Sequence, residues 1–181
     1  VGVGGQGTLL ASRILGKVAI KEGYDVKVSE VHGMSQRGGS VVTYVKYGDK
    51  VYSPIIDRGE ADLILAFEML EAMRALPYLK KGGKMIANTQ KMNPMPVITG
   101  AMEYPENIEE KLSAKINLQA VDALSLAEKA GTIKAVNVVL IGLLAKSMDV
   151  DKNVWIDVIK ETVPEKFLDV NIKAFELGYE L

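Results

Sequence analysis

The chain has 181 residues, is 48% hydrophobic and carries a formal net charge of -1, which predicts one compact domain over residues 1–181 with its own core. The balanced charge argues against nucleic acid or a membrane surface as a partner, because both require an excess of Lys and Arg. There is no cysteine, which excludes disulfides, thiolate zinc sites, a cysteine nucleophile and cysteine-ligated iron–sulfur clusters on this chain.

Two further features concern the location of the protein and its N-terminus. The longest uncharged apolar run, residues 135–145, is shorter than the roughly 20 residues that cross a bilayer. No secretory signal is visible, so we expect a cytoplasmic protein. The sequence opens without Met on what reads as the end of a strand, and we therefore expect a few residues to be missing upstream.

In chain order, the first third of the sequence alternates between strand and helix patterns. Residues 1–3 are typical of the tail of a strand, and residues 7–21 of a helix with apolar residues at four-residue spacing. Residues 25–30 alternate as a strand. Residues 41–47 are β-branched and aromatic, and a turn leads from them to residues 51–52, which predicts a hairpin of these two segments.

The remaining sequence has the βαβ rhythm of a parallel sheet. It predicts strands at 63–67, 84–87 and 114–118, a turn at 80–83, and helices at 68–79, 105–112, 122–130, 134–148, 151–159 and 165–177. The expected fold is an α/β domain, doubly wound and Rossmann-like, with a mostly parallel sheet, a β-hairpin and a helical C-terminal region.

The first motif is Gly2-x-Gly4-x-x-Gly7, placed between a strand and a helix. Glycines in this context let a pyrophosphate rest on the helix N-terminus, and Glu30 follows near the spacing of a ribose-binding acid. One hypothesis is therefore a stand-alone NAD-dependent oxidoreductase. The alternative is that the three glycines only permit a tight turn and close helix–strand packing.

The second motif is the segment from His32 to Ser40, with the sequence HGMSQRGGS. Its glycines let the main chain approach a ligand or partner closely, and its Ser, Gln and Arg side chains add donors for an anion or a carbonyl. Arg37 is the first candidate, because a guanidinium grips a phosphate, a carboxylate or a carbonyl in a fixed geometry. The alternative is a surface arginine paired with an acid such as Glu30.

Other polar residues have less specific interpretations. His32 is the only histidine, so no multi-histidine metal site is possible and it is the single candidate imidazole proton carrier; the alternative is a loop residue bonded to backbone. Gln6 and Thr8 can donate to a ligand at the first loop, although Thr8 is also placed to cap the helix. Glu68 and Glu71 follow a strand, where ligands collect in open α/β sheets, but acids in a first helical turn are expected for dipole reasons alone. Asn137 either faces a ligand or ties two elements together, and we expect the second.

Apolar residues outside the regular elements suggest a surface contact. The connector at 92–102 is rich in Met and Pro and would be costly to leave bare in water, so we expect a subunit interface there; the alternative is a loop folded back on its own core. The aromatic residues Trp155, Phe167 and Phe175 have helical spacing and are predicted to be core residues.

Taken together, GVGGQGTLLAS at 2–12 and EVHGMSQRGGSV at 30–41 resemble the gamma-type domain of 2-oxoacid:ferredoxin oxidoreductases, and most of all its indolepyruvate type, where that domain is the small (beta) subunit. Further similarity lies in ADLILAFE at 61–68, in the Gly82-Gly83 pair and in Asn137 within an apolar helix. The resemblance covers nearly the whole chain.

The resemblance implies a subunit that is inactive alone, in a cytoplasmic complex that oxidatively decarboxylates aryl 2-oxoacids such as indolepyruvate to acyl-CoA and passes electrons to ferredoxin. It implies a large alpha subunit that carries thiamine diphosphate, Mg²⁺ and the iron–sulfur clusters, with coenzyme A as acyl acceptor, and no cofactor held tightly by this chain. The residues it marks for cofactor contact are Gly4, Gly5, Gln6, Gly7, Thr8, Ser35, Gln36, Arg37, Gly38 and Gly39. A non-catalytic scaffold module is a third hypothesis beside this one and the NAD enzyme.

Overall fold

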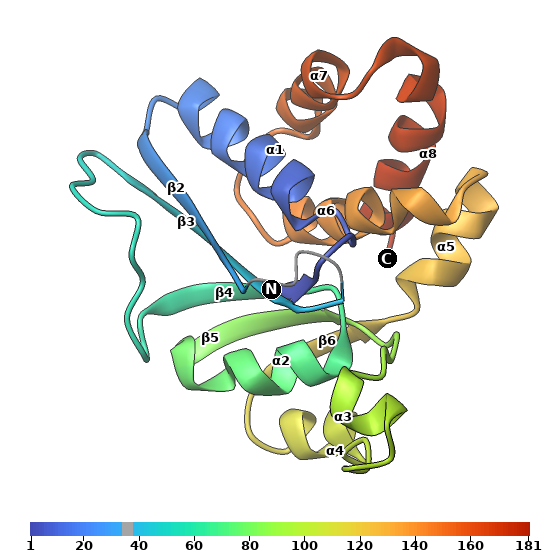
Figure 1. Ribbon diagram of the computed structural model, residues 1–181. Coiled ribbons are helices and arrows are strands. Elements are labelled where there is room, and N and C mark those ends of the chain that lie inside the picture. The colour runs from blue at the N-terminus through green and yellow to red at the C-terminus, as the bar shows by residue number, and fades with distance from the viewer. Residues whose placement is uncertain (34–37) are drawn as a thin grey trace.

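The computed structural model describes residues 1–33 and 38–181, and in this part of the chain six strands form two sheets (Figure 1). The first sheet is antiparallel in the order β1-β3-β2, with β1 at Gly2–Val3, β2 at Asp25–His32 and β3 at Ser40–Gly48. The second sheet is parallel in the order β4-β5-β6, with β4 at Ala61–Ala66, β5 at Leu79–Asn88 and β6 at Asn117–Val121.

Val1 joins the two sheets. Its amino group donates to the Leu65 carbonyl at 2.8 Å, and the Phe67 N–H donates to the Val1 carbonyl at 2.9 Å. This is the bonding pattern of a parallel pair, with Val1 opposite Ala66. The strands therefore follow one another in the order β2-β3-β1-β4-β5-β6, and the join depends on a single residue.

Helices cover both faces of the parallel sheet (Figure 1). The helices are α1 (Thr8–Lys21), α2 (Met69–Ala75), α3 (Met95–Ile98), α4 (Ile108–Ser113), α5 (Ala123–Ala130), α6 (Val136–Lys146), α7 (Lys152–Thr162) and α8 (Leu168–Tyr179), with short 3-10 turns η1 (Leu76–Tyr78), η2 (Ile133–Ala135) and η3 (Glu165–Phe167). One face carries α6, with α5 and α8 packed beyond it, and the other carries α2 and α4. Helix α1 packs on β2 and β3 of the antiparallel sheet, with α7 against it.

Because helices cover both faces of the parallel sheet, a cluster of buried apolar side chains lies on each face. Along β5, Ile86 packs into the cluster with α1 and α6, whereas Met85 and Ala87 pack into the cluster with α2 and α4. Strands buried on both faces read as continuous apolar runs, which explains the uninterrupted apolar sequence of β4. Helix α6 is buried nearly all round, as an uncharged apolar helix requires. Among the helices that the structure describes, none is long and apolar enough to cross a membrane.

The predicted α/β class, the parallel βαβ units and the helical C-terminal region are confirmed. The predicted hairpin of 41–47 with 51–52 is wrong: β3 pairs with β2, with Tyr47 opposite Val26. An eight-residue β2 offers a full ladder, whereas Val51 and Tyr52 are followed by Pro54 and form no strand. Val51 instead donates its N–H to the Asp25 carboxylate at 2.9 Å.

Several element ends also differ from prediction. Helix α2 ends at Ala75 because Pro77 turns the chain into η1. The predicted turn at 80–83 lies inside β5, where the register against β4 shifts and Gly82 has a φ of 82°. The predicted strand at 114–118 begins at Asn117, since α4 continues to Ser113.

The aromatic core predictions hold for two of three residues. Trp155 and Phe175 are fully buried, but Phe167 is 48% exposed. It lies in η3, where Lys166 stacks over its ring.

Candidate functional site

The two glycine-rich loops lie side by side. The Gly4 N–H donates to the Gly39 carbonyl at 2.8 Å, and the Gly38 N–H donates to the Gly4 carbonyl at 3.3 Å. The contact continues the β1–β3 ladder, in which Val3 is opposite Ser40. Two motifs that are about thirty residues apart in sequence therefore form one backbone surface at the edge of the sheet.

The conformation of these loops explains their glycines. Gly5 and Gly38 have φ values of 103° and 75°, in the left-handed region, and a Cβ added at either would meet no atom of residues 1–33 and 38–181 within 4 Å. Glycine is required there for backbone conformation and not for packing. The open space beside both residues leaves the main chain accessible to a ligand or a partner chain.

Gly7 differs from Gly5 and Gly38 because the side chain of Asn137 lies against it. A Cβ on Gly7 would overlap Nδ2 of Asn137, which donates to the Gly7 carbonyl at 3.4 Å. Asn137 lies in the first turn of α6, so the predicted role of Asn137 as a tie between two elements is confirmed. The tie holds the first loop to the C-terminal helices.

Gln6 is engaged within the fold. Its Oε1 accepts the Val3 N–H at 2.8 Å, and its Nε2 donates to the Phe67 carbonyl at 3.0 Å. The same carbonyl accepts a bond of 3.3 Å from the fully buried Asn88. Gln6 thus connects β1 to the end of β4, and these two bonds hold its side chain in place while one N–H of its amide keeps no printed partner among the described residues.

Thr8 does not cap its helix, contrary to the prediction. The residue in the cap position of α1 is Gly7, and no side chain there bonds the helix N–H groups. Thr8 is the first helical residue, only 9% exposed, and lines a cavity between β3 and β4. Its place is set by packing.

The carboxylate of Glu68 accepts three hydrogen bonds in the site. Glu68 follows β4 and is 1% exposed, and its carboxylate accepts from the N–H groups of Glu71 at 2.9 Å and Met92 at 3.0 Å. It also accepts from the Tyr104 hydroxyl at 2.5 Å. Burial and this bond raise the pKa of Tyr104. Glu68 therefore caps α2, holds the start of the 92–102 connector at Met92 and holds the chain just after its end at Tyr104.

Glu71 links α2 to the second glycine loop. Its carboxylate, 3% exposed, accepts from the Ser40 hydroxyl at 2.5 Å and from the Arg74 guanidinium at 2.6 Å. Ser40 directly follows Gly38-Gly39. This contact was not predicted from sequence, where an acid in a first helical turn is explained by the dipole alone; the partner lies 31 residues away and no local pattern marks it.

The outer part of the second loop has one described candidate, His32. It is exposed at the end of β2, and its Nδ1 lies 3.2 Å from the Gly33 carbonyl, as the backbone-bonded interpretation predicts. Glu30 lies on β2, where Thr43 donates to it at 3.3 Å. Arg37, with its neighbours Ser35 and Gln36, lies outside the described residues, and so does the predicted pairing of Arg37 with Glu30.

The strand order argues against a dinucleotide site of the NAD type. In that fold the strand that carries the ribose-binding acid is adjacent to the strand before the glycine loop. Here β3 lies between β1 and β2, so Glu30 is separated from the Gly4–Gly7 loop by a whole strand. Asn137 also covers Gly7, where a pyrophosphate would approach the start of α1.

The residues of this chain do not fit the clusters that the resemblance implies for the complex. Thiolates hold iron–sulfur clusters, and the sequence contains no cysteine. In residues 1–33 and 38–181 no three His, Asp or Glu side chains gather in a way that could hold a metal ion. The described parts of the glycine loops offer open main chain at Gly5 and Gly38.

The 92–102 connector presents apolar side chains outward. It contains the short helix α3, and Met95, Ile98 and Met102 are 66%, 64% and 66% exposed. The connector does not fold back to bury these three side chains, and its helix α3 lies beside α4 (Figure 1).

Comparison with known proteins agrees with this arrangement. Residues 1–181 match the family described as pyruvate ferredoxin/flavodoxin oxidoreductase. The indolepyruvate oxidoreductase subunits IorB of Thermococcus kodakarensis and Pyrococcus horikoshii are 45% and 46% identical, over 98% of this chain and 91% of each relative.

Among solved structures, the gamma subunit of a keto/oxoacid ferredoxin oxidoreductase from Geobacter sulfurreducens has the same fold. It is 26% identical, with a TM-score of 0.72 over 99% of this chain and 93% of its own. Sequence and fold lead to one assignment: the chain belongs to the pyruvate ferredoxin/flavodoxin oxidoreductase family.

Proposed function

We propose that this chain is the small subunit of an indolepyruvate:ferredoxin oxidoreductase, which converts an aryl 2-oxoacid to an acyl-CoA and delivers electrons to ferredoxin. The two archaeal relatives support this, because both are named as subunits of indolepyruvate oxidoreductase and match 98% of the chain. Because the chain has no cysteine, the clusters belong to a partner chain. The chain is therefore active only in the complex.

The observation that carries the proposal is the pair of bonds between Gly4 and the Gly38–Gly39 segment. It fixes the base of the second loop against the first, at the carboxyl end of the sheet, where α/β proteins present their ligand-binding loops. Arg37 directly precedes Gly38 in sequence, so its backbone is one residue from a fixed point. The sequence therefore puts a guanidinium directly before the anchored Gly38–Gly39 pair.

Within the complex, thiamine diphosphate on the large subunit supplies carbanion stabilisation and coenzyme A accepts the acyl group. The share of this chain is to shape and close that site. The guanidinium of Arg37 suits a bidentate bond to a phosphate of coenzyme A, and the open backbone at Gly5 and Gly38 lets such a group approach closely. The guanidinium of Arg37 also suits a hydrogen bond to a carbonyl of the large subunit. Substitution of Arg37 affects the KM for coenzyme A in the first role and subunit association in the second.

We further propose that Met95, Ile98 and Met102 contact the large subunit. Large apolar side chains gathered in one exposed group mark interaction surfaces. The start of the connector and the chain just after its end are fixed to Glu68 through the N–H of Met92 and the hydroxyl of Tyr104. The exposed residues are therefore held on a defined frame, which favours a permanent contact over a mobile one.

The decisive experiment is anaerobic purification of the tagged chain from its own cells. A large partner that carries thiamine and iron, with turnover only when 2-oxoacid, coenzyme A and ferredoxin are all present, supports the proposal. A chain that emerges alone, or that binds NAD, contradicts it. In the purified complex, Arg37→Ala raises the KM for coenzyme A at least tenfold if Arg37 binds the phosphate, and reduces co-purification instead if it anchors the subunit.

Two controls make the result specific. Arg58→Ala removes an exposed arginine on the loop after β3 and should change neither quantity. The double substitution Met95→Ser and Ile98→Ser should weaken co-purification, whereas Tyr52→Ser, at a residue 84% exposed elsewhere on the surface, should not.

A further inference from the structure

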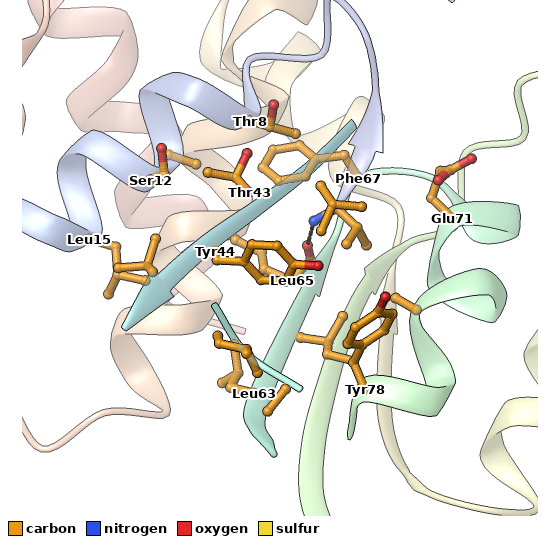
Figure 2. A pocket seen from close by; sticks show the side chains of 18 of the residues that line it. Thr8, Ser12, Leu15, Thr43, Tyr44, Leu63, Leu65, Phe67, Glu71 and Tyr78 are labelled. Atoms are coloured by element: carbon orange, nitrogen blue, oxygen red, sulfur yellow. Dashed lines mark hydrogen bonds between the residues drawn. The ribbon is translucent and has the colours of Figure 1, made fainter. Parts of the chain in front are cut away.

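Glu71 is a buried acid whose position is not explained by its own helix. It lies in the first turn of α2, close to the end of β4, and is 3% exposed (Figure 2). The helix dipole explains an acid that stays in water at this position, and the cap of α2 is supplied by Glu68, whose carboxylate accepts the Glu71 N–H at 2.9 Å. Burial of an ionised carboxylate is costly without partners, so the burial of Glu71 has to be explained by what it bonds.

The two oxygens of Glu71 have different partners. Oε1 accepts from the Arg74 guanidinium at 2.6 Å, one turn further along the same helix. The Arg74 side chain is half exposed, so this pair compensates the buried charge from the solvent side without fixing another element. Oε2 accepts from the Ser40 hydroxyl at 2.5 Å, and Ser40 is the first residue of β3. The bond to Ser40 therefore joins α2 to the antiparallel sheet.

Ser40 directly follows the contact between the two glycine loops. In this loop contact, Gly4 donates to the Gly39 carbonyl at 2.8 Å and accepts from the Gly38 N–H at 3.3 Å. A Cβ on Gly38 would meet no atom of residues 1–33 and 38–181 within 4 Å, so side-chain packing does not fix this segment. Ser40 is the first residue after the two glycines with a side chain that bonds a neighbouring element. Glu71 therefore ties one end of the loop contact to α2.

The charge of Glu71 strengthens this tie. A hydrogen bond from a hydroxyl to an ionised carboxylate is roughly twice as strong as one between neutral groups. A carboxylate offers acceptors to both Ser40 and Arg74, whereas glutamine has one acceptor oxygen and turns its NH2 group toward one of the two donors. Replacement by glutamine therefore keeps the size of the side chain and weakens its bond to Ser40.

We propose that Glu71 is a positioning residue: through the Ser40 hydroxyl it holds Gly38 and Gly39 against Gly4, in the geometry in which their open main chain receives an anionic group of coenzyme A. The inference rests on the proposed function for the identity of that ligand. Glu71 itself does not touch coenzyme A, because it is 3% exposed and both of its oxygens are bonded within the protein.

The first test measures the loop contact in the purified protein, without turnover. Amide hydrogen exchange is followed by mass spectrometry in peptides that contain Gly4 and Gly38, the two N–H donors of the contact. Glu71→Gln and Ser40→Ala should each speed this exchange at least about tenfold, because the segment opens more easily without the side-chain bond. The double variant should exchange no faster than either single variant, because both substitutions remove the same bond.

The second test measures the consequence in the purified complex. We expect Glu71→Gln and Ser40→Ala to raise the KM for coenzyme A at least about fivefold and to leave kcat within about twofold, because they displace binding groups and not reacting atoms. Ser40→Thr keeps a hydroxyl and should recover most of the affinity that Ser40→Ala loses. A general loss of folding would instead lower kcat and the yield of the complex together.

The matched control is another bond between a serine and a carboxylate. The Ser125 hydroxyl donates to Asp122 at 2.5 Å at the start of α5, after β6, which is two strands from β4 in the parallel sheet. Ser125→Ala removes this bond and should change neither the exchange at Gly4 and Gly38 nor the KM for coenzyme A.

Three results would overturn the proposal. Unchanged exchange at Gly4 and Gly38 in the Glu71→Gln variant would show that Glu71 does not hold the contact. Faster exchange with an unchanged KM for coenzyme A would show that the contact does not serve this ligand, and a Ser40→Thr variant that behaves like Ser40→Ala would show that the hydroxyl is not the link. The exchange test needs neither a partner nor coenzyme A, so it decides the role of Glu71 even where the proposed function fails its own test.

Discussion

Gly5 and Gly7 are two residues apart in one loop but need glycine for different reasons. Both have φ in the left-handed region, at 103° and 83°. Gly5 has open space where a Cβ would be, whereas a Cβ on Gly7 would overlap the amide of Asn137. Gly7 therefore carries a packing requirement in addition to the conformational one.

Replacing Gly7 should cost more stability than replacing Gly5. Gly5→Ala forces a left-handed alanine and should lower the free energy of unfolding by about 1–2 kcal/mol. Gly7→Ala adds an overlap with Asn137, which should cost about 1–3 kcal/mol more. Urea denaturation of the two variants measures the difference. Equal losses would mean that the Asn137 contact is easily displaced.

Side-chain roles in the site were harder to predict than backbone roles. The glycines were predicted correctly as turn-forming residues because positive φ is a local property. Gln6, by contrast, was a candidate ligand donor, yet both ends of its amide bond the fold, one of them at Phe67, 61 residues away. Ser40 and Glu71 meet across 31 residues. No local sequence pattern specifies such distant partners.

At the scale of elements, helices α6 and α8 cross at two glycines. A Cβ on Gly142 would overlap the Phe175 carbonyl, and one on Gly178 would overlap the backbone of Val139. The helices thus touch backbone to backbone, which only glycine permits. Gly16 in α1 is different, because its nearest neighbour would be a Val28 methyl at 3.5 Å, an ordinary contact.

Alanine should therefore have opposite effects in these two helices. Gly142→Ala must push α8 away and should destabilise the protein by about 2–3 kcal/mol or more. Gly16→Ala gains helix propensity without crowding and should stabilise it by up to about 1 kcal/mol. Thermal unfolding of both variants checks the prediction. A stabilised Gly142→Ala variant would show that the crossing is not tightly packed.

The elements themselves were largely predictable, but their pairing was not. Continuous apolar runs and helical periodicity identified β4, β5, α1 and the C-terminal helices, because these signals depend on burial of neighbouring residues. The partner of β3 was assigned wrongly to residues 51–52, since a nearby turn favours a local hairpin. β3 pairs with β2, the strand just before it, and with β1, more than thirty residues earlier, so the turn that follows β3 does not indicate either partner.

At the scale of the whole molecule, two sheets and two cores are connected through Val1. Its bonds to Leu65 and Phe67 are the main-chain link between the antiparallel and parallel sheets in the described residues. Gln6 adds a side-chain link to Phe67 close by. In a protein made to begin at Val1, the ionisation state of this amino group should therefore affect the stability of the whole chain.

The sign of that effect follows from the lowered pKa. The Val1 amino group has its pKa reduced from 8.0 to about 6, so between pH 6 and 8 the unfolded chain binds more protons than the folded one. The free energy of unfolding should rise with pH across this window, by about 2–3 kcal/mol at most, and level off above pH 8. The carboxyls with lowered pKa values, Asp25 and Asp122, titrate below the window.

Urea denaturation of the 181-residue chain at pH 6, 7 and 8 measures this slope. The His32→Gln variant removes the only histidine and should keep the slope, whereas acetylation of the Val1 amino group should abolish it, because no charge is then buried at the join. A slope that survives acetylation would assign the pH dependence to another group and leave the join uncharged at neutral pH.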